Sequence, residues 1–134
     1  MIWSFYKNGI DLLHPEVCWM GGHKQLVLEF PGVYGIIAFF YEIFGASHST
    51  ARAVLLLFFV GGTVYLYKIT AFLLNTIVAR LSLLIYLTLP LGLFYSRAIQ
   101  IDFSAMFFVL AMTYHFIVGY TNKRLIHIAI GSVF

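Results

Sequence analysis

The chain has 134 residues, of which 62% are hydrophobic and only 10% are charged. A soluble domain carries about 25% charged residues, so this composition excludes an ordinary soluble domain and places the chain in a lipid bilayer. The formal net charge of +3 comes from eight Lys and Arg residues scattered among apolar runs, which excludes nucleic acid as the partner. The single cysteine, Cys18, excludes a disulfide framework and every cysteine-rich zinc motif.

Residues 1–52 hold four of the five acidic residues, and we expect them to form an exported loop. Within this loop, the segment between Pro31 and Gly45 is apolar but is interrupted by Glu42. It has only about 14 residues, too few to cross a bilayer comfortably. We therefore expect a helix at about 31–45 that lies at the membrane interface with its aromatic face among the headgroups. A short helix in the bundle core is the alternative. Turn-forming pairs occur at Asn8-Gly9 and Gly21-Gly22.

Residues 53–134 are expected to form a transmembrane bundle. From 53 to 94 the only charged residues are Lys68 and Arg80, and these 42 residues are about twice the ~20 that one helix needs to cross a bilayer. Two spans joined by a tight hairpin fit best, with both cations close enough to one interface to extend into water. The last apolar run covers roughly 15 Å, about half of a hydrocarbon core. The expected spans are 53–72, 77–95, 103–120 and a truncated 125–134.

The charges orient this bundle. The two short turns hold nothing but positive charge, whereas the opposite side holds all five acidic residues. Each side has four Lys and Arg residues, so their number alone does not decide the orientation. Positive charge at short loops favours the cytoplasmic side, and we therefore expect the two short turns in the cytoplasm. The turn side has Lys68, Arg80, Lys123 and Arg124, and the other has Lys7, Lys24, Arg52 and Arg97. We expect a multi-pass protein of a bacterial or archaeal cell (inner) membrane.

Both ends of the chain lead to a further expectation. The first 17 residues lack the apolar core of 7–15 residues that a signal peptide needs, although the loop that they begin is expected to be exported. We therefore expect a preceding span, and a piece of a longer polytopic protein.

Several short motifs follow one another in a recognisable order. The chain reads FYKNGIDLLHPEV, EFPGVYGIIAFFYEIFG, TARAVLLLFFVGGTVYLYK and LTLPLGLFYSRAIQIDFSAMFFVLAMTYHF. This order resembles the N-terminal part of family 39-type glycosyltransferases of the GT-C superfamily, which include protein O-mannosyltransferases and relatives of the lipid A aminoarabinose transferase. The resemblance covers nearly the whole chain. The matching positions are Glu29 and Pro31, Phe44 and Gly45, Ala51 and Arg52, Pro90, Tyr95-Ser96-Arg97, and Asp102.

The resemblance implies an all-α, polytopic membrane bundle of GT-C type with an interfacial helix in its first exported loop. It implies a glycosyltransferase that moves a sugar from a polyprenyl-phosphate carrier to a lipid, glycan or protein acceptor at the non-cytoplasmic face. The main catalytic base of such enzymes lies upstream of the matching region, so we expect this chain alone to be inactive. A non-catalytic membrane scaffold or assembly subunit is the alternative function, and a transporter fragment is a third.

Four residues are candidates for the site that the resemblance implies. Asp102 is the candidate catalytic acid, with helix capping or ion pairing as the alternative. Arg97 is a candidate ligand of the carrier phosphate through its planar guanidinium, or an interfacial anchor. Arg52 is a candidate substrate-binding residue, although anchoring or structural pairing is favoured. Glu29 is a candidate cavity residue, and a divalent metal bound there is the one cofactor that the resemblance suggests.

The histidines and glycines receive local interpretations. His14 and His23 lack the spacing of a helical metal site, and loop polarity explains them. His115 lies inside an apolar span, where either a function or a hydrogen bond across helices accounts for it. The Gly61-Gly62 pair is expected to allow two helices to approach closely.

Overall fold

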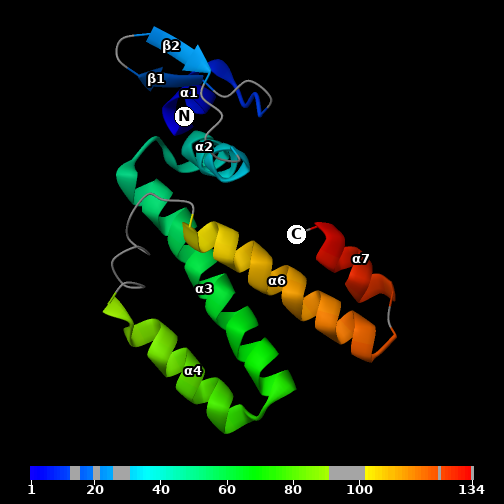
Figure 1. Ribbon diagram of the computed structural model, residues 1–134. Helices are drawn as coiled ribbons and strands as arrows, with labels where there is room; N and C mark the ends of the chain where they lie inside the picture. Colours follow the sequence, from blue (N-terminus) through cyan, green and yellow to red (C-terminus); the bar gives the residue numbers. More distant parts are fainter. Residues whose placement is uncertain (13–15, 20–21, 26–30, 91–101, 124, 134) are drawn as a thin grey trace. The chain divides into compact units, whose positions relative to one another are not determined.

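The computed structural model describes residues 1–12, 16–19, 22–25, 31–90, 102–123 and 125–133 (Figure 1). Two compact units make up the chain, Met1–Val54 and Leu55–Phe134, and each is considered by itself. Helix α3, His48–Leu73, runs across the boundary between them. Two of the described helices, α3 and α6 (Asp102–Thr121), are long and apolar enough to cross a membrane.

The first unit starts with helix α1, Ile2–Asn8, which packs against helix α2, Gly32–Phe44. The Tyr6 and Tyr41 rings meet edge to face at 5.9 Å between centroids. Burial raises the pKa of the Tyr41 hydroxyl above its usual value. Apolar side chains of α2 lie on two sides: Val33, Ile37 and Ala38 are buried, whereas Phe39, Ile43 and Phe44 are exposed.

Glycine and proline set the limits of α2. Pro31 occupies the N-cap position, where its missing N–H costs no helical hydrogen bond. Gly45 ends the helix with a φ of 85°, a backbone conformation that favours glycine, and its N–H donates to the Tyr41 carbonyl. The helix therefore ends where the sequence indicates. Its exposed aromatic side chains are compatible with the expected place at the membrane interface.

A small hairpin between α1 and α2 adds strands to the expected all-α fold. Strand β1, Glu16–Trp19, pairs antiparallel with strand β2, Gly22–Gln25. Because Trp19 is opposite Gly22, only two residues separate the strands, the shortest common hairpin connection. The sequence analysis found the turn-forming Gly21-Gly22 pair but assigned no strands to its flanks.

The second unit consists of helices. Helix α4, Thr76–Thr88, and helix α7, Leu125–Val133, accompany α6 and most of α3. At ~1.5 Å per residue, the 26 residues of α3 extend about 39 Å and the 20 residues of α6 about 30 Å, enough for a hydrocarbon core. Most of both helices remains unburied, as expected for surfaces that face lipid. The architecture is an all-α membrane helical bundle.

The turn between α3 and α4 is short and capped. The Asn75 side-chain oxygen accepts a hydrogen bond from the Val78 N–H at 2.8 Å, which satisfies one of the donors at the start of α4. The helix ends at Thr88, and Leu89 is extended, as expected for the residue before Pro90. The apolar run predicts a span at 77–95. The described helix stops earlier, and residues 91–95 lie outside the described part of the chain.

Helices α3 and α6 run side by side and in the same direction (Figure 1). The Phe59 ring contacts Phe103 at 5.0 Å between centroids, and the Tyr65 ring contacts Tyr114 at 5.7 Å. Residue numbers thus increase together along both helices, which makes the pair parallel. Helix α4 returns beside α3, with Tyr86 stacked on Phe59 at 5.3 Å.

Gly61 of α3 lies directly against the Phe107 ring of α6. A Cβ atom placed on Gly61 would lie 2.7 Å from a carbon of the Phe107 ring, whereas one on Gly62 would have no neighbour closer than 3.9 Å. The expected close approach at this glycine pair is therefore confirmed, and it depends on Gly61.

Candidate functional site

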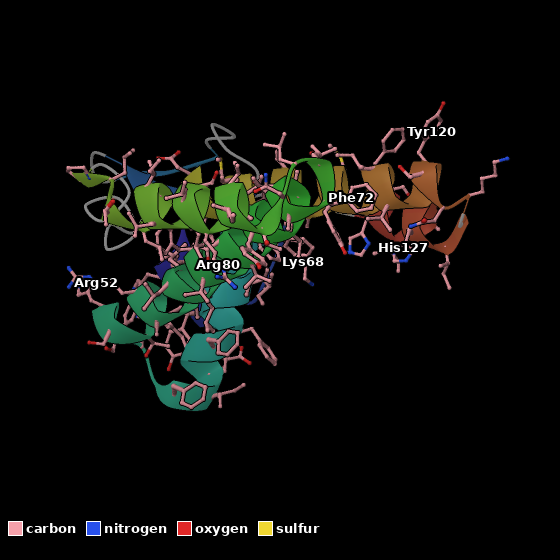
Figure 2. The ribbon with its side chains drawn as sticks, turned by 90° about the horizontal axis from the view of Figure 1, so that it is seen from below. Arg52, Lys68, Phe72, Arg80, Tyr120 and His127 are labelled. Carbon is pink, nitrogen blue, oxygen red and sulfur yellow. The ribbon has the colours of Figure 1, made fainter. Side chains whose placement is uncertain are left out.

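Two of the four candidate site residues lie in the described part of the chain. Asp102 is the first residue of α6, and Arg52 lies in the second turn of α3. Both side chains are exposed, and Figure 2 shows Arg52 extending away from the ribbon. Neither makes an ion pair with another residue that the structure describes. Arg97 and Glu29 lie outside the described residues.

An aromatic cluster holds the start of α6 in place. Phe103, the residue after Asp102, meets the Phe59 ring edge to face and lies 6.5 Å from the Tyr86 ring. Ser104 is fully buried. Asp102 is exposed beside this packed turn, so its carboxylate sits on a rigid support. A carboxylate in the first turn also interacts favourably with the helix dipole, the structural role that the sequence analysis left open.

Tyr86 is a polar group near this end of α6 that the sequence analysis missed. Its hydroxyl is buried and has no hydrogen-bond partner among the described residues. A buried hydroxyl without a partner costs about 1–3 kcal/mol, so such a group points to an interaction beyond the described protein atoms. The sequence offers no signal for it, because Tyr86 stands in an apolar run where a tyrosine suggests packing alone.

Helix α3 begins with two local hydrogen bonds that fix the backbone ahead of Arg52. The Ser47 hydroxyl oxygen accepts from the Ser49 N–H at 3.0 Å, and the Thr50 hydroxyl donates to the Gly45 carbonyl at 3.2 Å. A guanidinium near the start of a helix opposes the helix dipole. Helix stability therefore does not explain Arg52, which leaves anchoring at the interface or binding of an anion.

A second polar cluster lies near the opposite ends of α3 and α6. It consists of Tyr65, Lys68, Tyr114, His115 and His127, and we call it the Lys68 cluster. The Tyr65 hydroxyl lies 3.4 Å from His115 Nε2, and His115 Nδ1 lies 3.1 Å from His127 Nδ1. His115 thus bonds across helices to both α3 and α7. The sequence analysis singled out Lys68 and His115, but the other three members come together only in the fold.

Metal binding finds no support in the part of the chain that the structure describes. Those residues contain no group of three or more His, Cys, Asp or Glu side chains that could hold a metal ion. His115 and His127 form a pair, which is fewer ligands than a protein site for zinc requires. Glu29, the expected ligand, is not among the described residues.

Comparison with known proteins identifies the family. Residues 29–134 match the model of the dolichyl-phosphate-mannose-protein mannosyltransferase family. No match was found among curated proteins or among solved structures. The matched region includes all four candidate residues and every helix from α2 onward. The match confirms the resemblance to GT-C glycosyltransferases: the chain belongs to the dolichyl-phosphate-mannose-protein mannosyltransferase family.

Proposed function

We propose that this membrane protein takes part in the transfer of a sugar from a polyprenyl-phosphate carrier to an acceptor at the non-cytoplasmic membrane face. The observation that carries the proposal is the parallel arrangement of α3 and α6, two helices long enough to span, within the matched family region. Parallel spans begin at the same face of the membrane. Asp102, the first residue of α6, thereby offers a carboxylate to that face.

The chemistry of the proposed reaction needs both cations and a carboxylate. The carrier's lipid tail stays in the bilayer while its sugar phosphate lies in water at the surface, where cations stabilise the phosphate. A carboxylate can accept a proton from the acceptor hydroxyl or orient that hydroxyl. Asp102 is assigned to this role as an acid of the cavity. Arg52 and Arg97 are assigned to the phosphate, for which the planar guanidinium provides two parallel donors.

The remaining assignments follow from the family. Glu29 is proposed as a further residue of the cavity and as a ligand of a divalent metal. The acceptor is a lipid, a glycan or a protein. We assign residues 1–52 and 96–102 to the outside of the cytoplasm of a bacterial or archaeal cell, because the charged residues near the short turns of the other side are all Lys or Arg.

Substitution of Asp102 tests the proposal in the longer protein to which this chain is expected to belong, in its native membrane. Asp102→Asn keeps the shape of the side chain and removes its charge. We expect transfer from radiolabelled polyprenyl-phosphate sugars, mannose included, to fall on the order of 10²-fold at unchanged membrane abundance. Glu42→Gln is the matched control, since it removes the same charge from an exposed position on α2 and should leave transfer unchanged.

Two outcomes would contradict the proposal. If Asp102→Asn transfers sugar at the parental rate, Asp102 only stabilises the start of α6. If the longer protein to which this chain is expected to belong transfers no sugar from any of the donors, the alternative of a non-catalytic scaffold or assembly subunit is favoured instead.

A further inference from the structure

Lys68 is a cation for which the second unit provides no counter-charge. Its Nζ lies 5.5 Å from the centroid of the Tyr65 ring and 5.5 Å from that of Tyr114. The only acidic residue from Leu55 onward is Asp102, which precedes Tyr114 by twelve positions on α6 and hence by about 18 Å. The two aromatic faces hold the ammonium group in position without neutralising it. The side chain is exposed, so an anion from outside the protein can reach it.

Tyr65, His115 and His127 form the hydrogen-bonded part of the Lys68 cluster. Its hydrogen bonds can run in two directions, and in both directions one donor is left at an end. In one direction the Tyr65 hydroxyl donates to His115 Nε2, His115 Nδ1–H donates to His127 Nδ1, and the Nε2–H of His127 is left at the end. In the other direction His127 Nδ1–H donates to His115 Nδ1 and His115 Nε2–H donates to the Tyr65 oxygen, which leaves the Tyr65 O–H at the end. Both tyrosine and histidine ends are partly exposed. The cluster therefore presents a cation and a donor, which is the combination that an anionic oxygen binds.

The depth of the cluster selects the kind of anion. Lys68 lies five residues before the end of α3, and His115 lies six residues before the end of α6, distances of about 7.5 and 9 Å along the helices. Side chains at this depth reach the boundary between acyl chains and headgroups. Contacts through Tyr65 and His115 connect Lys68 with His127. A phosphate held there belongs to a lipid, since a soluble ion would have to leave water to reach the aromatic rings.

We propose that the Lys68 cluster binds the phosphate of an anionic phospholipid headgroup, at the membrane face opposite to Asp102. Lys68 provides the charge, Tyr65 and Tyr114 position its Nζ, and the tyrosine and histidine chain provides a hydrogen-bond donor. Arg80, Lys123 and Arg124 are the other cations that the sequence assigns to this side, and none of them belongs to the cluster. The proposal concerns lipid binding and is independent of the proposed sugar transfer.

Native mass spectrometry of the purified full chain in detergent tests the proposal. Phosphatidylglycerol, phosphatidylcholine and inorganic phosphate are the probes. We expect retention of phosphatidylglycerol over phosphatidylcholine, and about fivefold weaker binding of phosphatidylglycerol by Lys68→Gln, which loses the charge that contacts the phosphate. His127→Asn removes the Nε2 donor at one end of the chain and Tyr65→Phe removes the O–H donor at the other, so the double variant should weaken binding as well.

Arg80→Gln is the matched control, because it removes one exposed cation of the same side that does not belong to the cluster. It should bind phosphatidylglycerol as the parent does. Equal weakening by Arg80→Gln and Lys68→Gln would show a diffuse charge effect and overturn the site. Equal retention of both lipids by the parent would overturn it too, and displacement of phosphatidylglycerol by millimolar inorganic phosphate would replace the lipid site by a site for soluble phosphate.

Folding is measured separately, by circular dichroism and thermal unfolding in detergent without added lipid. A variant that unfolds at the parental temperature but has lost lipid retention supports the site. If Lys68→Gln instead lowers the unfolding temperature without lipid and retains phosphatidylglycerol as the parent does, Lys68 serves packing and the proposal is wrong.

Discussion

Two neighbouring residues of one helix can differ in how they affect the packing of this bundle. Gly61 lies against the Phe107 ring, whereas its neighbour Gly62 has room for a methyl group. Membrane helices gain little from burying apolar surface against one another, since lipid is equally apolar, so van der Waals contact at such small residues stabilises their association. The absent side chain of Gly61 thus leaves room for the Phe107 ring against α3.

Substitution of this glycine should destabilise the bundle. Gly61→Ala places a Cβ atom 2.7 Å from a Phe107 ring carbon, and either the ring or the helix must move. Overpacking of this kind costs about 1–3 kcal/mol, and we expect a lower unfolding temperature in detergent. Gly62→Ala is the matched control and should unfold as the parent does. Equal unfolding temperatures for both variants would show that the ring adapts without cost.

Short-range interactions explain where the helices of this chain begin and end. The Asn75 side chain caps α4, Ser47 caps α3, and the positive φ of Gly45 ends α2. Pro90 excludes a helical conformation for Leu89 and so limits α4. The elements therefore begin and end largely where their own residues require it.

The cap of α4 can be tested by removal and replacement. Asn75→Ala leaves the Val78 N–H without its side-chain acceptor, and we expect a loss of about 0.5–2 kcal/mol of stability, measured by thermal unfolding in detergent. Asn75→Asp retains an acceptor and should restore most of that loss. If the alanine and aspartate variants unfold at the same temperature, water or lipid headgroups satisfy this N–H equally well.

Topology is a property of the whole molecule, and it decides which face carries each cluster. Positive charge in the turns predicts that Asn75 and Lys123 are cytoplasmic and that Gly22 and Ile99 are exported. Cysteines introduced singly at these positions, in a background without Cys18, can be labelled with an impermeant maleimide on intact cells. We expect labelling at positions 22 and 99 alone. Labelling at 75 and 123 with none at 22 and 99 would reverse the orientation and exchange the faces of Asp102 and Lys68.

Much of the fold followed from composition and pattern. Apolar runs indicated a helical membrane bundle, Pro31 and Gly45 indicated the ends of a short helix, and the glycine pair indicated a close contact. The β hairpin was missed because its two strands are four residues each and lack a clear alternation of apolar side chains. Arg52 and Asp102 could be chosen as candidate site residues from their positions at the ends of apolar runs and from the family resemblance. Neither signal predicts which side chains pack around them.

The sequence by itself determined the class of this protein, because 62% hydrophobic residues and their run lengths leave a bilayer as the only favourable environment. It also contained the order of motifs that places the chain in its family. Only the tertiary structure decided which polar side chains meet. Tyr65, His115 and His127 stand up to 62 positions apart and on three helices, so their hydrogen bonds depend on the direction and rotation of each helix. Those quantities arise from packing between helices, which no local pattern encodes.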